Sequence, residues 1–258
     1  MPRLALVGNL SRDVVDGAPP RIGGGAFYAA RAWRALGARA TIFTRCSPED
    51  RAAYSRSLIA VGLPVVMLPG TATTAFSFYY VDSTRVMTVE HTGDAWTPAD
   101  AREVTPGAWV HAAPLLRSEF PAETLAALAR GRRLSFDGQG LVRVAEEGPL
   151  RLDGDFDPEV LRHLQILKLA EEEAEVIGAV DRLGVPEVLV TYGPKGSRVL
   201  FNGRWEKVGA WPVASDPTGC GDAFSAAYLA GRARGLGPVS AARRATGLVT
   251  AMLLRRVS

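Results

Sequence analysis

The sequence predicts an α/β protein of three layers, with helices on both faces of a mainly parallel central sheet. Short apolar runs such as Leu4–Val7 and Val188–Thr191 alternate with longer segments of helical period. This alternation is typical of parallel strands joined by helical crossovers. Loops rich in glycine and aspartate follow several of the strands, and ligands of such sheets bind beyond the carboxyl ends of the strands.

The amino-acid composition is typical of a globular protein with a hydrophobic core. The chain has 258 residues, of which 47% are hydrophobic and 22% charged, and its net charge is +3. No linker divides it, so we expect a single domain over residues 1–258. The arginines are scattered, which argues against a nucleic-acid face. Cys46 and Cys220 lie far apart, and no apolar run is long enough to cross a bilayer, so we expect a cytoplasmic protein without a membrane partner.

The first elements follow the β/α alternation. Leu4–Val7 reads as a strand buried on both faces, and residues 10–15 as a more exposed strand. The glycines at 23–25 then precede a helix over Phe27–Leu36, which ends at Gly37. The elements predicted next are a strand at 40–43, a helix at 50–61 and a strand at 64–68.

Residues 73–91 interrupt this alternation. Two β-rich runs flank a predicted turn at 82–85, which indicates a hairpin outside the main sheet. Alternation then resumes to the C-terminus. The predicted strands are 108–112, 133–136, 166–169, 188–191, 197–201 and 204–208, and the predicted helices are 121–130, 158–164, 171–178, 223–234 and 239–254.

The stretch 215–224 carries the clearest chemistry. It leads into an apolar segment of small residues, and a helix starting near Gly221 would point unpaired N–H groups outward as an anion site. Asp222 would compete with an anion there, unless it accepts a proton from a nucleophile that attacks a bound phosphoryl group. Read alone, the stretch is equally compatible with an ordinary capped helix.

Other site classes are excluded by their missing motifs. The chain has no Gly-x-x-x-x-Gly-Lys-Ser/Thr loop, no Gly-x-Gly-x-x-Gly after the first strand and no Gly-x-Ser-x-Gly. His91, His111 and His163 are too dispersed for a metal site. Asp137 and Arg143 read as loop residues rather than ligand contacts.

Four motifs, in order, resemble those of the ribokinase-like, or PfkB, family of carbohydrate kinases. Asp216–Phe224 is similar to its C-terminal signature, and residues 23–26 with the following helix are similar to its N-terminal one. Thr191–Gly196 resembles the family's Thr-x-Gly-x-x-Gly nucleotide loop. Lys168–Glu173 resembles its Lys-x-Asn-x-x-Glu segment.

The resemblance implies an ATP-dependent kinase that uses Mg²⁺ and phosphorylates a hydroxyl of a sugar, cyclitol or nucleoside. It implies a small β lid formed by about 10–16 and 73–91. Asp222 would be the base beside an anion hole of N–H groups. The residues assigned by this resemblance are Gly219, Cys220 and Gly221 for the anion hole, Thr191, Gly193, Gly196 and Thr218 for the nucleotide, Asp13, Gly24, Gly25 and Tyr28 for the acceptor, and Glu173 for the metal.

Departures from the family pattern leave the acceptor open. Tyr28 and Ala170 stand where the family usually has Asn, and Pro217 where Thr is usual. One alternative is a kinase of a vitamin precursor, of the pyridoxal or hydroxymethylpyrimidine type. Another is a non-catalytic sugar or nucleotide sensor. A monovalent cation beside Asp216 and a homodimer formed through the lid strands are left open as well.

Overall fold

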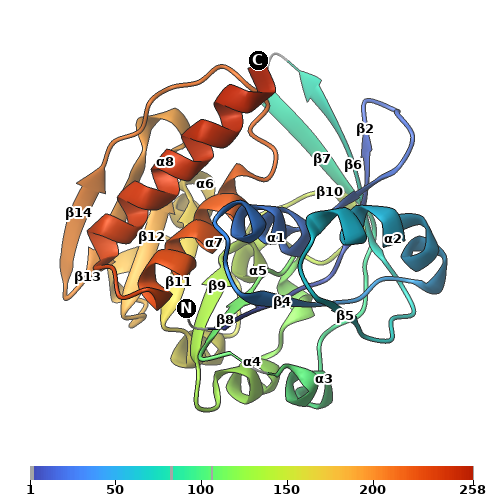
Figure 1. Ribbon diagram of the computed structural model, residues 1–258, viewed down its shortest axis with the longest axis horizontal. Coiled ribbons are helices and arrows are strands. Elements are labelled where there is room, and N and C mark those ends of the chain that lie inside the picture. Colours follow the sequence, from blue (N-terminus) through green and yellow to red (C-terminus); the bar gives the residue numbers. More distant parts are fainter. Residues whose placement is uncertain (1–2, 82–83, 106, 258) are drawn as a thin grey trace.

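A mixed sheet forms the centre of the protein (Figure 1), a computed structural model that describes residues 3–81, 84–105 and 107–257. Strands from β12 to β5 pair in parallel, and β13 and β14 add antiparallel at one edge. The predicted fold class is confirmed. The strand order is β14 (Arg204–Val208), β13 (Ser197–Phe201), β12 (Glu187–Thr191), β11 (Ile166–Ala170), β9 (Arg133–Asp137), β8 (Trp109–Ala112), β1 (Leu4–Val7), β4 (Ala40–Thr44) and β5 (Val65–Met67).

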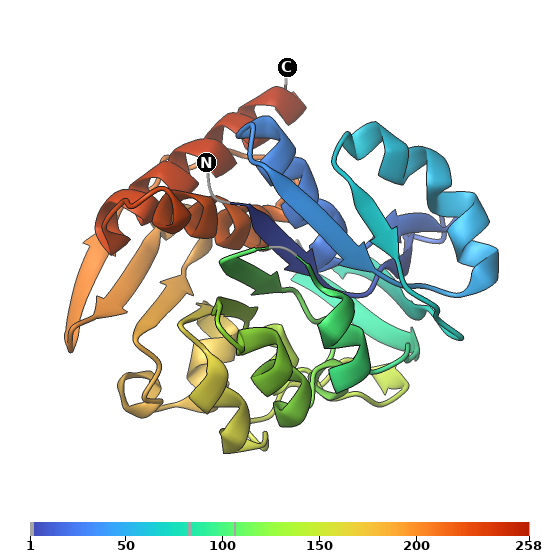
Figure 2. The same ribbon diagram turned by 60° about the horizontal axis from the view of Figure 1, so that its bottom comes forward.

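Helices cover both faces of this sheet (Figure 2). One face carries α1 (Gly25–Ala35), α7 (Cys220–Ala233) and α8 (Pro238–Val257), with α2 (Pro48–Val61) beside α1. The other face carries α3 (Pro98–Glu103), α4 (Ala122–Ala129), α5 (Gln139–Val142) and α6 (Glu171–Ile177).

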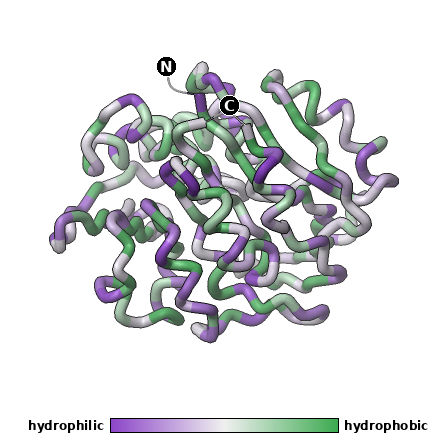
Figure 3. Tube along the Cα trace, turned by 90° about the horizontal axis from the view of Figure 1, so that it is seen from below, coloured by the Kyte–Doolittle hydropathy of each residue, from purple (hydrophilic) through white to green (hydrophobic). Residues whose placement is uncertain are grey.

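Each face of the sheet has its own hydrophobic core. In β1, Leu4 and Leu6 pack under α1 and α7, whereas Ala5 and Val7 pack on the opposite side. This is the two-sided burial that a continuous apolar strand predicts. Along the outer helices hydrophobic and hydrophilic stretches alternate, as expected for helices that bury one side (Figure 3). Among the described residues no helix is long and apolar enough to cross a membrane.

A second, smaller sheet contains the predicted hairpin. Its order is β10 (Gly148–Pro149), β7 (Thr84–His91), β6 (Thr74–Val81), β2 (Ser11–Val15) and β3 (Arg21–Gly23). The predicted hairpin and the strand near residues 10–15 are therefore paired with each other, while β3 and β10 were not predicted. The turn residues 82–83 lie outside the described part of the chain. That this sheet acts as a lid stays a prediction.

Several boundaries differ from the predicted ones. Helix α7 begins at Cys220, slightly earlier than expected, and the predicted helix at 158–164 is a 3-10 helix, η2 (Pro158–His163). Helix α3 was missed, although Thr97, Pro98 and Asp100 form a capping box with proline in the first turn. The remaining 3-10 turns are η1 (Arg117–Glu119), η3 (Val180–Arg182) and η4 (Gly193–Lys195).

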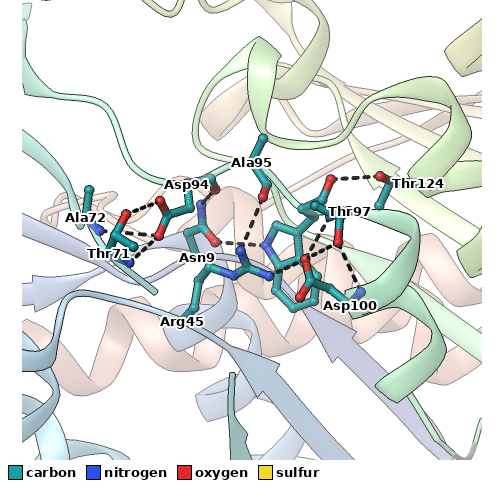
Figure 4. Close-up of polar contacts among 10 residues, drawn as sticks. Asn9, Arg45, Thr71, Ala72, Asp94, Ala95, Thr97, Asp100 and Thr124 are labelled. Carbon is teal, nitrogen blue, oxygen red and sulfur yellow. Dashed lines mark hydrogen bonds and ion pairs between the residues drawn. The ribbon is translucent and has the colours of Figure 1, made fainter. Parts of the chain in front are cut away.

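A buried polar network anchors the chain where it returns from the small sheet (Figure 4). Asn9, just after β1, donates to the Asp94 carbonyl and accepts from Trp96 Nε1, both at 2.8 Å. Arg45, just after β4, lies 4.8 Å from the Trp96 ring centroid and pairs with Asp100 at 2.6 Å. These contacts join loops at the carboxyl ends of two neighbouring strands to the start of α3.

Glu119 makes a second connection between the two sheets. Its carboxylate accepts from Thr74 Oγ1 at 3.1 Å, at the start of β6, and from Leu115 N at 2.8 Å. The Glu119 side chain is buried, and burial raises its pKa to about 7. The small sheet is thus joined to the core through a carboxylate as well as through the chain itself.

Arg45→Met should lower the free energy of unfolding by about 3 kcal/mol, because it breaks a largely buried ion pair and leaves the Asp100 carboxylate without its cation. Urea denaturation measures the loss. Arg56→Met, an exposed arginine of α2, is the matched control and should change stability by less than about 0.5 kcal/mol. Equal losses in both variants would contradict a special role for the network.

Candidate active site

The candidate site lies at the carboxyl edge of the main sheet, where the connections diverge. From β1 the strand order continues through β4 to β5 on one side and through β8 to β12 on the other. In open α/β sheets ligands bind at such a switch point. The predicted acceptor residues come from β2 and α1, and the predicted anion-binding residues from the start of α7.

The acceptor side begins at Asp13 in β2. Its side chain is buried, and its Oδ1 accepts from Ser11 Oγ at 2.6 Å. Gly24 precedes α1 with a φ of 101°, a conformation that a residue with a side chain rarely adopts. The predicted acceptor residues therefore lie on adjoining elements, with the carboxylate held in a fixed orientation.

The residues predicted to bind the acceptor meet the residues predicted to bind the anion at Gly25 and Asp222. A Cβ at Gly25 would lie 2.8 Å from Asp222 Oδ1, so only glycine lets this carboxylate approach the start of α1. Helices α1 and α7 pack together largely through alanines, and Trp33 Nε1 of α1 donates to the Ala226 carbonyl of α7 at 2.7 Å. The close helix packing places Asp222 directly over Gly25.

The anion loop offers fewer free donors than the sequence predicted. Gly219 caps α7 with a φ of 75°, and the Cys220 N–H donates to the Pro217 carbonyl at 2.9 Å. That N–H is therefore used within the loop, which corrects the prediction of three free donors. The N–H groups of Gly219 and Gly221 donate to no acceptor within the described ranges. Burial raises the pKa of the Cys220 thiol, which disfavours a thiolate nucleophile.

Tyr28 joins the acceptor side to the anion loop. A Cβ at Gly219 would lie 2.5 Å from Tyr28 Cδ1, so the aromatic ring packs directly on that glycine. Burial, with the charge of Asp13 adding to it, raises the pKa of Tyr28 to about 12. The residue that replaces the family's Asn thus keeps its hydroxyl proton and fills the space between α1 and the loop before α7.

A buried cluster of charges lies under the start of α7. Lys168 Nζ of β11 is 3.5 Å from Asp137 Oδ1 of β9, and Ser225 Oγ of α7 donates to Asp137 Oδ2 at 3.2 Å. The reading of Asp137 as a loop residue was wrong, because it ends a strand and is buried against α7. Strand register explains the pair, since Asp137 and Lys168 are direct partners in neighbouring parallel strands.

The cluster shifts the titration of its members. Burial raises the pKa of Asp222 to about 6; Asp137 adds to this rise and Lys168 opposes it. Burial alone would lower the pKa of Lys168, but the charges of Asp137, Glu173 and Asp222 outweigh burial, and the net pKa is raised. At neutral pH Asp222 is therefore mostly ionised, and it interacts electrostatically with an amine that stays charged.

Glu173 is held as a helix cap and borders this cluster. Its Oε2 accepts from the Ala170 N–H at 2.8 Å, and burial raises its pKa. No group of three or more His, Cys, Asp or Glu side chains in the described part of the chain is arranged to hold a metal ion. Mg²⁺ at phosphoryl-transfer sites takes one or two carboxylates and completes its shell with phosphates and water. Glu173, with one carboxylate oxygen not used by the Ala170 N–H, fits such a shared site, whereas both oxygens of Asp137 are engaged by Lys168 and Ser225.

A cavity of about 300 Å³ opens on the other side of the anion loop. The predicted nucleotide residues Thr191, Gly193 and Gly196 line it, together with Cys220 and Gly221. Thr218 does not line this cavity; its N–H and hydroxyl both donate to Asp216 Oδ1, at 2.9 and 2.6 Å. The apolar part of the wall is formed by Pro194, Ala210, Trp211, Val213, Pro217, Phe224, Val249 and Leu253.

Comparison with known proteins agrees with the motifs. Residues 157–256 match the model of the pfkB family carbohydrate kinase. A solved pyrophosphate-dependent kinase in the ribokinase family, in a sulfate complex, has 28% identity and a TM-score of 0.83, and the match covers 97% of this chain and 95% of that one. Residues 157–256 therefore match this family, and the whole chain is similar to a solved kinase of the ribokinase family. The resemblance predicted from the four motifs is confirmed.

Two further relatives bear on the substrates. A pyrophosphate-dependent kinase in the ribokinase family, complexed with a pyrophosphate analog and myo-inositol, has 27% identity and a TM-score of 0.84, over 97% of this chain and 95% of its own. Inositol 3-kinase of Zea mays is 34% identical over 109 residues, which cover 42% of this chain and 27% of that protein. This chain thus spans about a quarter of the length of that curated relative.

Sequence reasoning missed Lys168 and Asp137 as members of the site. The motif around Lys168 was noticed for its glutamate, and the lysine was given no role. Its signal was a charged residue within an otherwise apolar strand, Ile166–Ala170, where an unpaired charge is costly. A lysine in a strand that is predicted to be buried should therefore have been assigned an acidic partner.

Asp222→Asn should stabilise the fold most at neutral and alkaline pH. Folding raises the pKa of Asp222 from its usual value to about 6, so the wild type loses stability as the pH rises between 4 and 7. Because Asn carries no charge, the variant should gain on the order of 2 kcal/mol at pH 7.5, and the gain should vanish toward pH 4. Urea unfolding at several pH values measures this.

Asp181→Asn, at an exposed acid, is the matched control for that experiment and should show no such gain. A gain for Asp222→Asn that does not depend on pH would contradict a raised pKa of the Asp222 carboxyl.

Proposed function

We propose that this protein is an ATP-dependent kinase that transfers the γ-phosphoryl group to a hydroxyl of a small polyol, with a cyclitol of the inositol type as the favoured acceptor. The observation that carries the proposal is the place of Asp222. Its carboxylate touches the start of α1 at Gly25 and belongs to the same helical turn as the free N–H of Gly221. A base thus lies between an acceptor side and an anion site.

The chemistry follows from this placement. Asp222 accepts the proton of the acceptor hydroxyl as the oxygen attacks the γ-phosphorus, and the bond from that phosphorus to the bridging oxygen of the leaving ADP breaks. The N–H groups of Gly219 and Gly221 face the oxygens of the transferred group. Phosphoryl transfer depends on positioning and charge neutralisation. Rigid packing of α1 on α7 supplies the positioning.

The apolar lining of the cavity beside the anion loop favours a nucleotide over pyrophosphate as the phosphoryl donor. Pyrophosphate is a compact anion that needs cations and N–H donors, whereas the cavity next to the anion loop is mostly apolar. Trp211 lines it with 81% of its surface exposed, which suits stacking on a base. The two solved relatives named for pyrophosphate therefore differ from this protein in the proposed donor.

The proposed acceptor rests on the relatives and on Tyr28. An inositol 3-kinase and a kinase bound to myo-inositol are both similar to this chain, which favours a polyol over a vitamin precursor. The Asp13 carboxylate can accept hydrogen bonds from hydroxyl groups of the polyol. Tyr28 offers a hydroxyl donor and the flat face of its ring to a ring-shaped polyol. Mg²⁺, bound through the donor phosphates, would neutralise their charge, and Glu173 would hold its water.

A transfer assay tests the proposal directly. The protein should phosphorylate myo-inositol with ATP and Mg²⁺, and the rate with pyrophosphate at equal concentration should be at least tenfold lower, because pyrophosphate leaves the apolar cavity unfilled. Phosphate nuclear magnetic resonance identifies the product, and ribose, inosine and pyridoxal serve as competing acceptors. Faster transfer from pyrophosphate would contradict the proposed donor, and a preference for pyridoxal would contradict the proposed acceptor.

Asp222→Asn should lower kcat by about 10²–10⁴-fold, because the amide cannot accept the hydroxyl proton. Affinity for ATP, measured by calorimetry, should change less than about threefold. In the wild type, kcat/KM should rise with pH, reach half of its maximum at about pH 6 and level above about pH 7, as Asp222 becomes ionised. Asp181→Asn is the control with unchanged turnover. An active Asp222→Asn enzyme would overturn the assigned base.

A further inference from the structure

Lys168 has an amine that the proposed mechanism has not yet used. We propose that Lys168 is a further catalytic residue, whose ammonium group contacts the transferring phosphoryl group from beneath the first turn of α7. The inference rests on the proposed kinase function. It assigns to this chain a fixed internal cation at the reacting phosphorus.

The position of the amine is the first observation. Lys168 lies in β11 and is 5% exposed, yet a Cβ at Gly221 would lie only 3.1 Å from its Nζ. The amine therefore reaches the backbone that carries one of the free N–H donors. Lys195 and Lys207, the other two lysines of the chain, are both exposed.

The second observation is that the ammonium group of Lys168 has more N–H donors than hydrogen-bond partners. An ammonium group has three N–H donors. Within the described ranges Lys168 forms one hydrogen bond, to Asp137 at 3.5 Å. Charge-assisted hydrogen bonds are usually 2.7–2.9 Å long. The amine is thus held near Asp137 without being saturated by it, and donors remain for an anion above.

The third observation is the charge around it. Asp137, Glu173 and Asp222 raise the pKa of Lys168 and Arg143 lowers it, so this cluster sets three carboxylates against two cations. A triphosphate approaching such a region would be repelled unless a cation stood next to its phosphoryl oxygens. Lys168 is placed to provide that cation, and Ser225, by binding Asp137, holds the pair in position.

The contribution is electrostatic and needs no proton from Lys168. As the acceptor oxygen bonds to phosphorus and the bond to the bridging oxygen of ADP breaks, charge spreads over the equatorial oxygens. The ammonium donates an N–H to one of them and keeps its proton. Asp222 still takes the hydroxyl proton, so the two residues have separate roles.

Lys168→Met tests the proposal, because methionine keeps the length of the side chain and removes the charge. We expect kcat to fall by about 10²–10³-fold, the usual loss when one donor to a developing oxyanion is removed. The KM for the acceptor should change less than about threefold. Lys207→Met, at an exposed lysine of β14, is the matched control and should keep wild-type kcat.

A double variant separates catalysis from structure. If Lys168 only neutralises Asp137, then Lys168→Met with Asp137→Asn removes both charges and should restore turnover together with stability. If Lys168 acts on the phosphoryl group, the double variant regains thermal stability but its kcat stays at least 10²-fold low. Recovery of kcat to within threefold of the wild type would overturn the proposal.

Binding gives a readout that does not need turnover. In the absence of metal, Lys168→Met with Asp137→Asn should bind the non-hydrolysable analogue AMP-PNP at least fivefold more weakly than Asp137→Asn alone, by calorimetry. Equal affinities would overturn the proposal. If the wild type binds AMP-PNP and transfers no phosphoryl group, the proposed kinase function fails, while this comparison still decides whether Lys168 binds the phosphates.

Discussion

Close approach between a side chain and a glycine backbone is the constraint on which the site depends. Asp222 lies against Gly25 and Tyr28 against Gly219, where a Cβ would come within 2.8 and 2.5 Å of the neighbouring atom, and Lys168 Nζ lies close to Gly221, where a Cβ would be 3.1 Å away. Each contact joins two elements that are distant in the chain. Substitution of Gly25 or Gly219 would force the neighbouring side chain to shift, so these groups would move apart even if the fold survived.

The desolvated charges of the site destabilise the folded protein. Desolvation raises the pKa of Asp222 and of Glu173, which means that the folded protein would be more stable with these groups neutral. Lys168 offsets part of this cost, and strand register rather than loop sequence puts it beside Asp137. The same desolvation makes Asp222 a stronger base than a solvated aspartate, so the destabilising feature is also the useful one.

Local motifs predicted the fold class and most of the site because they combine glycine with polar residues at strand ends. Gly25, Gly219 and Asp222 were all recognised in this way. The pairing of Asp137 with Lys168 was not, since it depends on which strands become neighbours. The use of the Cys220 N–H by Pro217 depends on the exact loop geometry. The network around Arg45 was missed because each of its members is ordinary when read alone.

The alanine-rich contact between α1 and α7 has a consequence for how this site can change. In the proposed mechanism the acceptor binds beside one helix and the base belongs to the other, so the separation of the two helix axes would set how far the attacking oxygen is from the phosphorus. Alanine side chains keep that separation near its minimum. A larger residue there would act on the reaction through distance alone, from a position that touches neither substrate. In that mechanism the packing of one helix pair controls the reaction distance as directly as the residues that bind the ligands do.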